Sequence, residues 1–373
     1  MPTKSVQRVR DVLVRPFSLG SLTLPNRVVM APMTREFSPG GVPGDDVARY
    51  YARRAAAGVG LIITEGTYVG HDSAGSSARV PHFHGDEALA GWSAVADAVH
   101  RAGGRIMPQL WHVGMDRTAG SPPVPDAPRI GPSGIAPDGT RSGREMTRAD
   151  IDDVVAAYAA SAASAEALGF DGVEIHGGHG YLIDQFLWPR TNRRTDAYGG
   201  DITGRTRFAA QVVAACRQSV SADFPISFRF SQWKVSHYDA RIVETPQELQ
   251  TMLGLLSEAG ADAFHCSTRR FHLPEFEGSD LNLAGWAKKL SGRPTISVGS
   301  VGLSNEFLQA LYQGERATVT DIGELLDRME RDEFDLVAVG RALLGDPEWL
   351  EKVLAGRVDE LTPFHVSLVG NLH

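Results

Sequence analysis

The sequence predicts a (β/α)8 TIM barrel, an α/β fold, with an N-terminal β-hairpin cap and long βα loops. Eight short apolar segments recur along the 373-residue chain, helix patterns lie between them, and no GxGxxG turn occurs. Segments that are apolar throughout are typical of parallel strands buried on both faces. A doubly wound sheet would be expected to carry the glycine-rich turn, so the alternation favours one barrel.

Eight predicted strands follow one another along the chain. They are RVVMAP (27–32), VGLIIT (59–64), RIMPQL (105–110), FDGVEIH (170–176), PISFRF (225–230), ADAFHC (261–266), PTISVG (294–299) and FDLVAVG (334–340). Residues 14–27 precede the first strand and read as a hairpin that caps the bottom of the barrel. Composition does not break anywhere, so we expect residues 1–373 to form a single domain.

Helix signals separate these strands. Thr147 to Asp150 read TRAD, a capping box, and apolar residues follow over 151–158 with the spacing of one helix face. Residues 245–249 (TPQEL) repeat the cap with proline at the first helical position. Residues 85–104 carry an apolar stripe and end in Gly-Gly.

Two connections, 111–146 and 177–203, are long enough that we expect lids or binding loops there. Later stretches, 231–241 and 265–286, are rich in charged and aromatic residues. These charges are as consistent with substrate contacts as with a solvated rim or a subunit contact.

Composition and charge exclude several classes of protein. The chain is 42% hydrophobic and 22% charged, with a net charge of −8 and no basic run, which disfavours a nucleic-acid partner. Cys216 and Cys266 form neither a CxxC motif nor a disulfide framework. The N-terminal residues lack the apolar core of a signal peptide, and no apolar run approaches the ~20 residues of a membrane span. We therefore expect a cytoplasmic protein without a membrane partner.

Polar and glycine residues gather where the predicted strands end, which is where barrels of this class place their active sites. Gly299 and Ser300 follow the seventh strand, and Gly340 and Arg341 follow the eighth. Glycines let backbone N–H groups approach an oxyanion and arginine adds a bidentate charge, so this pair of turns predicts a phosphate site. Each turn alone could equally be an ordinary one.

Two further polar residues interrupt apolar strands. Arg229 lies inside ISFRF, where a buried guanidinium needs an anionic or carbonyl-rich partner, and a salt bridge to Glu174 is the structural alternative. Gln109 offers a donor and an acceptor that suit the edge of a uracil-like ring. Its alternative is a hydrogen bond to the backbone at the barrel mouth.

The segment EIHGGHGYLIDQF places His176, His179 and Tyr181 after the fourth strand. Metal binding would need further ligands, and the HExxH arrangement is absent, so we predict no metal even with His265 available. Two neutral imidazoles whose N–H groups converge on one oxygen would polarise a carbonyl or nitro group. A nearby tyrosine hydroxyl could then protonate the adjacent carbon.

Over nearly its whole length the sequence resembles the Old Yellow Enzyme family of FMN-dependent ene-reductases. The resemblance rests on LPNRVVMAPMTR (24–35), RRAAAGVGLIITEGT (53–67), PQLWHVG (108–114), FDGVEIHGGHGYLIDQFLWPRTNRRTDAYGG (170–200) and FDLVAVGRALLGDP (334–347). The long fourth-strand segment is highly specific. The resemblance implies a bound FMN and a transient NAD(P)H, with NADPH favoured.

The resemblance also implies roles for individual residues. The positions that would contact FMN are Pro32, Thr34, Gly66, Gln109, Arg229, Gly299, Ser300, Gly340 and Arg341, the last four at its phosphate. His176 and His179 would bind the oxygen of an activated alkene, and Tyr181 would donate the proton. In the implied ping-pong mechanism, NAD(P)H reduces the flavin and leaves. Flavin N5 then gives hydride to the β-carbon of an α,β-unsaturated carbonyl or nitro compound.

Three other functions agree with the same sequence. One is an FMN-dependent amine dehydrogenase or demethylase on the same barrel. Another is a flavin-free lyase or isomerase that uses the phosphate site for a phosphorylated substrate, and the third is a non-enzymatic binding protein. Homo-oligomers and monomers are both compatible with the sequence.

Overall fold

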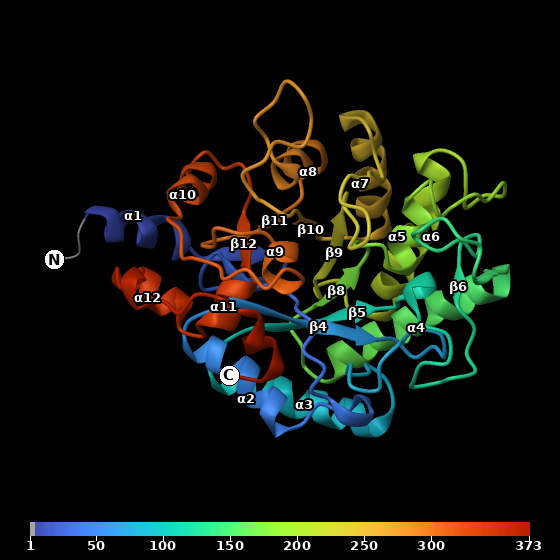
Figure 1. Ribbon diagram of the computed structural model, residues 1–373, viewed down its shortest axis with the longest axis horizontal. Helices are drawn as coiled ribbons and strands as arrows, with labels where there is room; N and C mark the ends of the chain where they lie inside the picture. Colours follow the sequence, from blue (N-terminus) through green and yellow to red (C-terminus); the bar gives the residue numbers. More distant parts are fainter. Residues whose placement is uncertain (1–3) are drawn as a thin grey trace.

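The computed structural model describes residues 4–373, without the side chains of residues 307 and 308, and its centre is a closed parallel barrel (Figure 1). In order around the barrel, its strands are β3 (Val28–Met30), β4 (Leu61–Tyr68), β5 (Ile106–Trp111), β8 (Val173–His176), β9 (Ile226–Ser231), β10 (Ala263–Ser267), β11 (Thr295–Val298) and β12 (Leu336–Val339). Pairing of β12 with β3 closes the circle. Each predicted segment overlaps one of these strands, although β4, β5, β9 and β10 extend beyond the predicted ends, and the predicted fold class is confirmed.

A two-stranded antiparallel hairpin precedes the barrel, as predicted. It consists of β1 (Phe17–Leu19) and β2 (Leu22–Leu24), and Leu19 and Leu24 are fully buried in one cluster with side chains from the barrel interior. The hairpin is itself preceded by α1 (Lys4–Leu13), which the sequence reasoning did not anticipate. This helix buries only a short apolar stripe, against α10 and α12.

Helices surround the barrel (Figure 1). They are α2 (Asp45–Ala56), α3 (Asp86–Arg101), α4 (Arg148–Ala167), α5 (Leu182–Leu187), α6 (Ile202–Ser219), α7 (Pro246–Ala259), α8 (Leu283–Ser291), α9 (Phe307–Leu311), α10 (Gly323–Glu330), α11 (Arg341–Gly345) and α12 (Trp349–Ala355). The predicted capping box is present at the start of α4, where Thr147 and Asp150 exchange hydrogen bonds. Thr245 caps α7, whose first residue is proline. Both caps follow from the chemistry of the first turn.

The two long connections hold short elements. The first contains the 3-10 turn η2 (Gly114–Asp116) and the paired strands β6 (Ile130–Gly131) and β7 (Arg144–Glu145). The second contains α5, which follows directly after the predicted His-His-Tyr segment. The remaining 3-10 turns are η1 (Pro39–Gly41), η3 (Val358–Glu360) and η4 (Val366–Gly370).

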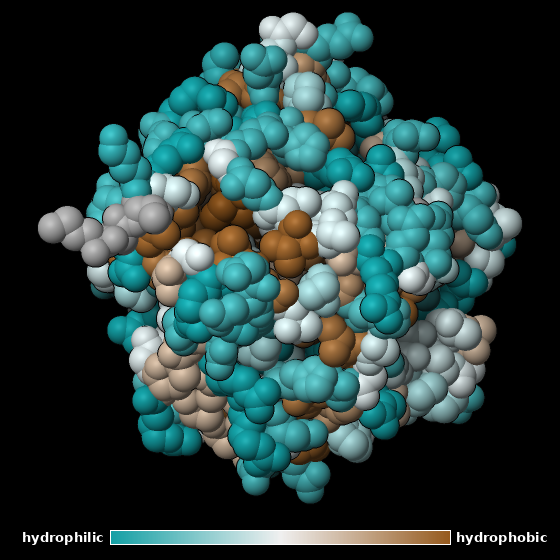
Figure 2. All heavy atoms as spheres, turned by 60° about the vertical axis from the view of Figure 1, so that its left-hand side comes forward, coloured by the Kyte–Doolittle hydropathy of each residue, from teal (hydrophilic) through white to brown (hydrophobic). Residues whose placement is uncertain are grey.

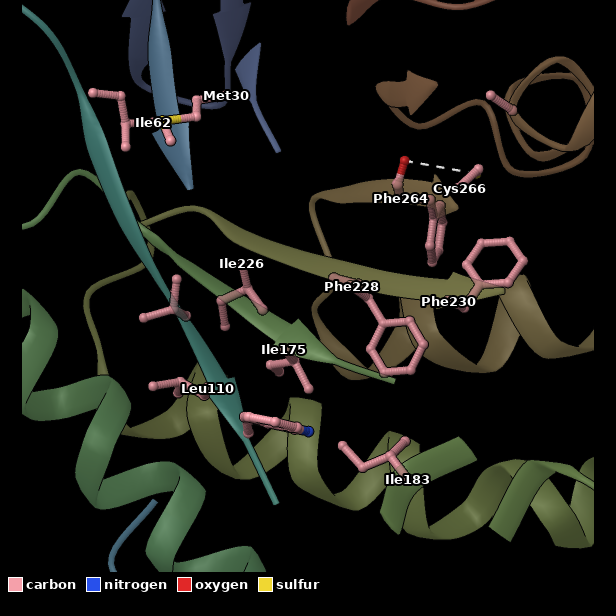
Figure 3. Close-up of a cluster of buried hydrophobic side chains, with 14 of the residues drawn as sticks. Met30, Ile62, Leu110, Ile175, Ile183, Ile226, Phe228, Phe230, Phe264 and Cys266 are labelled. Atoms are coloured by element: carbon pink, nitrogen blue, oxygen red, sulfur yellow. Dashed lines mark hydrogen bonds between the residues drawn. The ribbon is translucent and has the colours of Figure 1, made fainter. Parts of the chain in front are cut away.

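Alternate residues of each barrel strand enter different packing environments. On β8 and β9, Ile175, Phe228 and Phe230 belong to the large cluster that lies between barrel and helices (Figure 3). Inside the barrel a smaller apolar cluster draws mainly on β3, β4, β11 and β12, through residues such as Leu61 and Leu336, and includes Met107 of β5 and Ala263 of β10. This two-residue period is the ordinary consequence of strand geometry.

The interior side of β8, β9 and β10 is polar, which differs from the uniformly apolar strands that the sequence predicts. Buried Glu174 accepts hydrogen bonds from Gln109 Nε2 (2.8 Å) and Ser227 Oγ (3.2 Å), and its Oε2 lies 2.7 Å from His265 Nδ1. These bonds cross from strand to strand, so the side chains share one face. These polar side chains continue along the barrel interior toward the carboxyl ends of the same strands.

Most of the surface is hydrophilic on the face shown in Figure 2, where hydrophobic residues gather in a hollow left of the centre. Large exposed apolar side chains among the described residues are few, namely Val14, Leu273, Tyr312 and Val358. Nowhere from residue 4 onward does a helix combine the length and apolarity that crossing a membrane requires.

Candidate active site

A cavity of about 460 Å³ opens at the carboxyl ends of the barrel strands. Its walls include every residue that the sequence singled out for catalysis or cofactor binding: Pro32, Thr34, Gly66, Gln109, His176, His179, Tyr181, Arg229, Gly299, Ser300, Gly340 and Arg341. Its volume lies in the usual range of small-molecule sites. Residues from all eight strands, or from the loops that follow them, are thereby brought to one place.

One end of the cavity is built from the turns after β11 and β12. Ser300 has a left-handed backbone (φ 51°), and its hydroxyl lies 3.0 Å from Arg341 Nη2. Gly299 has φ +154°, and a Cβ there would lie 2.7 Å from the Thr268 carbonyl oxygen, so the turn requires glycine. Arg341 also donates to the Asn305 carbonyl (2.7 Å), and burial lowers its pKa to about 10. Even so, Arg341 remains a cation at neutral pH.

Arg229 supplies a second buried cation, from the middle of β9. Its Nη2 lies 3.4 Å from Ser267 Oγ, and its buried Nε has no hydrogen-bond partner among the described residues. Burial lowers its pKa to about 10. The alternative of a direct salt bridge to Glu174 is not what the structure shows, because Glu174 bonds with Gln109, Ser227 and His265 instead. A buried guanidinium in this state requires an acceptor from within the cavity.

The two histidines stand face to edge at the cavity wall. His176 Nε2 and His179 Nδ1 are 3.3 Å apart, and the ring planes meet at 89°. Burial, reinforced by the positive charge of Arg229, lowers the pKa of both imidazoles well below the usual range. Both rings are therefore neutral at physiological pH, and each carries one N–H group.

Tyr181 occupies the position before α5 and packs edge-on against its neighbours. Its ring lies 4.8 Å from the Trp111 ring and 5.1 Å from the His176 ring. Burial raises the pKa of its hydroxyl far above the usual range. The phenol consequently keeps its proton at any physiological pH.

Four residues that sequence reasoning did not assign to the site also shape it. Trp111 and Trp233 line the cavity, and the Trp233 ring lies 4.6 Å from the His179 ring. Ser231 and Ser267 end the neighbouring strands β9 and β10 in register with each other. Ser231 Oγ accepts the His179 backbone N–H (2.9 Å), and Ser267 Oγ lies 2.8 Å from His179 Nε2. The signal in the sequence was slight, a serine at the last position of two successive strands.

A fully buried ion pair lies behind the histidines. Lys234 Nζ donates to Asp184 Oδ1 (2.9 Å) and to the Gln232 carbonyl oxygen (2.7 Å), and the other Asp184 oxygen accepts the Gly180 N–H (2.5 Å). The pair ties the loop after β8 to the loop after β9. Spacing in the sequence offers no sign of this contact, since 50 residues separate its partners.

The distinctive loops contribute to the cavity mouth. Residues 231–241 provide Trp233 and Val235, and residues 265–286 provide Ser267 to Arg269. Arg269 lies over the Tyr238 ring at 4.2 Å and within 3.5 Å of Glu306. Along the described chain, residues 4–373, no group of three or more His, Cys, Asp or Glu side chains is placed to hold a metal ion.

Comparison with known proteins gives a consistent result. The model of the NADH:flavin oxidoreductase / NADH oxidase family matches residues 12–360. An NADH oxidase from Thermoanaerobacter brockii is 34% identical over 357 residues, which are 92% of this chain but only 50% of that protein, so the chain spans half the relative's length. 12-Oxophytodienoate reductase 7 from Oryza sativa subsp. japonica is 33% identical, with 94% and 90% of the two chains covered.

A solved structure is similar over the same extent. Morphinone reductase in complex with tetrahydroNAD superimposes with a TM-score of 0.77 at 30% identity, covering 92% of this chain and 91% of that one. The family match, residues 12–360, spans all eight barrel strands.

Proposed function

The chain belongs to the NADH:flavin oxidoreductase / NADH oxidase family, the Old Yellow Enzyme family, and we propose that it is an FMN-dependent ene-reductase. In this proposal NAD(P)H, with NADPH favoured, is the reductant. The acceptor is a small α,β-unsaturated carbonyl or nitro compound. We also propose that residues 1–373 act as one FMN-binding domain.

One observation carries the proposal. Two neutral imidazoles, with one nitrogen of each 3.3 Å apart, line the cavity beside an un-ionised tyrosine. Neutral N–H donors polarise a carbonyl or nitro oxygen without binding anions indiscriminately, and a phenol beside them can release a proton to carbon. The relatives that reduce 12-oxophytodienoate and morphinone support the same substrate class.

The residues present fit FMN. Arg229 presents a buried guanidinium without an acceptor at Nε, which suits the electron-rich ring edge, and Arg341 with Ser300 offers donors to a phosphate. Gly66 lines the same cavity and must be glycine, because a Cβ there would lie 2.6 Å from the Trp111 ring. When bound, FMN supplies the hydride chemistry that no side chain in the cavity can supply.

The protein's own residues then have separable tasks. His176 and His179 bind the substrate oxygen and draw negative charge toward it, which fixes the orientation of the double bond. Tyr181 holds a proton on its hydroxyl for the α-carbon. Trp111 packs against both His176 and Tyr181 and keeps water from that side of the cavity. Arg229, a buried cation in the cavity wall, would stabilise negative charge on a bound, reduced cofactor.

The experiment is an absorbance spectrum of the purified protein, titrated anaerobically with NADPH and then with cyclohexenone. We expect a yellow protein that NADPH bleaches and the enone reoxidises. A protein that remains colourless and takes up no added FMN would rule out the flavin-dependent functions. Reduction by amines alone would identify a demethylase or amine dehydrogenase instead.

A further inference from the structure

We propose that Ser267, supported by Arg229, sets the tautomer of His179 so that its Nδ1–H donates to the substrate oxygen. This inference rests on the proposed function and assigns to Ser267 a positioning role that neither the sequence nor the comparisons indicate.

The tautomer of His176 is fixed by the backbone. Its Nδ1 accepts the N–H of Gly178 at 3.3 Å. A neutral imidazole has one protonated nitrogen and one accepting nitrogen, so the proton of His176 lies on Nε2. That Nε2 is the atom 3.3 Å from His179 Nδ1.

His179 has two arrangements available. If its proton lies on Nε2, then His179 Nδ1 accepts the Nε2–H of His176. That N–H group is then used within the pair and is not available to a ligand. If its proton lies on Nδ1, both of the neighbouring nitrogens carry a proton, and an oxygen that lies beside the pair, within hydrogen-bond distance of each nitrogen, can accept from both. Both arrangements contain the same number of protons, so a change between them is not a titration.

Ser267 decides between these arrangements. Its hydroxyl oxygen is 2.8 Å from His179 Nε2 and 3.4 Å from Arg229 Nη2. Arg229 can only donate, so of these two neighbours only His179 Nε2 can accept the serine proton. A hydroxyl that accepts from a cation becomes a better donor. Donation from Ser267 leaves Nε2 unprotonated and places the proton of His179 on Nδ1.

The surrounding structure holds Ser267 and His179 for this task. Ser231, beside Ser267 in register, accepts the His179 backbone N–H at 2.9 Å. Trp233 covers the imidazole ring and donates Nε1–H to the Ser267 carbonyl oxygen at 3.1 Å. His179 itself has a left-handed backbone, with φ 65°. Ring, backbone and hydroxyl are thus each held by a separate contact.

The test reads the tautomer directly. We would record long-range ¹⁵N–¹H NMR spectra of histidine-labelled, FMN-loaded oxidised protein saturated with cyclohexenone, which cannot turn over without a reductant. In the wild-type protein we expect a pyrrole-like shift for His179 Nδ1 and a pyridine-like shift for Nε2. Ser267→Thr keeps the hydroxyl and should keep this pattern. Ser267→Val matches the threonine variant in shape but lacks the hydroxyl, and it should reverse the pattern.

Kinetics provide the second measurement. With Ser267→Val, kcat/KM for cyclohexenone should fall roughly 100-fold, comparable to loss of one oxyanion donor, and Ser267→Thr should restore most of the loss. A wild-type complex with the proton on His179 Nε2 would overturn the inference, and so would equal tautomers and rates in the Thr and Val variants. If the Val variant fails to bind FMN, the wild-type spectrum decides. Failure of the proposed function is distinct, because the enone would then neither bind nor reoxidise the reduced protein.

Discussion

Tyr181 is the residue whose chemistry depends most directly on its burial. Because its raised pKa keeps the hydroxyl protonated, the residue can donate a proton but cannot act as a base at neutral pH. We predict that Tyr181→Phe slows reoxidation of the NADPH-reduced enzyme by cyclohexenone by about 100-fold or more. Stopped-flow measurement of each half-reaction checks this, since NADPH oxidation should change much less. Equal slowing of both halves would contradict a role as proton donor.

Glu65 leads to a prediction about pH. Its Oε2 accepts the backbone N–H groups of Arg35 (2.8 Å) and Glu36 (3.1 Å), and burial raises its pKa to about 7. Between the pKa that Glu65 has in the unfolded chain and pH 7, its carboxyl group is protonated in the folded state but has lost the proton in the unfolded state. Stability conferred by this group therefore falls as pH rises through that window.

The Gln variant removes this pH dependence while keeping an acceptor for both N–H groups. From pH 5 to pH 8 we expect Glu65→Gln to gain about 2.5 kcal/mol of unfolding free energy relative to the wild type. Urea denaturation at each pH measures this difference. Glu258→Gln, at an exposed glutamate, is the control and should show no such gain. A constant difference across the pH range would show that Glu65 is already ionised at pH 5.

Among single residues, the sequence predicted those whose chemistry is unusual for their position in the chain. An arginine inside an apolar strand, and two histidines beside a tyrosine, stand out in any reading. Ser231 and Ser267 do not, because a serine at the end of a strand is common and its partner is chosen only by the register of β9 on β10. His265 likewise has a carboxylate partner, Glu174, that no spacing in the sequence reveals.

Among the elements, the loops after β8 and β9 depend on the buried pair of Lys234 and Asp184. Removing one partner leaves the other charge buried and unpaired, which typically costs 3–5 kcal/mol. We predict that Lys234→Met destabilises the protein by about that amount, measured by chemical denaturation. Adding Asp184→Asn should recover a large part of the loss, since the side-chain amide is neutral and its oxygen could still accept the Gly180 N–H.

An exposed ion pair provides the comparison for this prediction. Arg148 and Asp152 lie one turn apart on the surface of α4, where solvent screens their attraction. Arg148→Met should have no measurable effect on stability. If Lys234→Met cost no more than Arg148→Met, the buried pair would not be what joins the two loops.

Elements with a repeating or capped pattern were the predictable ones. Every barrel strand and the caps of α4 and α7 were located from the sequence, because burial on both faces and first-turn chemistry leave local traces. Helix α1 was missed, since it buries only a short stripe against helices from the other end of the chain. Helix α5 was hidden in a predicted loop, because it is six residues long and begins at the site itself.

On the scale of the whole molecule, the barrel interior divides into an apolar half and a polar half. The apolar half, formed by β3, β4, β11 and β12 together with Met107 of β5 and Ala263 of β10, contributes packing. The polar half, formed by β5, β8, β9 and β10, contains buried Glu174 with its three hydrogen-bonding neighbours and leads to Arg229 and the histidines. Burying a charged group is unfavourable in free energy unless the group is paired. In this molecule the buried charged groups of the barrel lie next to the cavity in which we propose that the reaction takes place.

The two halves meet at the cavity, so a ligand that contacts both should stabilise the entire barrel. We predict that FMN at 100 times its Kd adds about 2.7 kcal/mol to stability and raises the melting temperature by about 3–4 °C. Arg341→Ala removes charge-assisted donors next to Ser300, so the Kd for FMN should rise about 10- to 100-fold and the shift should shrink. Differential scanning fluorimetry across an FMN titration measures both the Kd and the shift in melting temperature.

Arg357→Ala, at an exposed arginine paired with Glu351 and Glu360, should leave the FMN-induced shift unchanged. Equal FMN affinity in the Arg341 and Arg357 variants would place the phosphate elsewhere than the turns after β11 and β12.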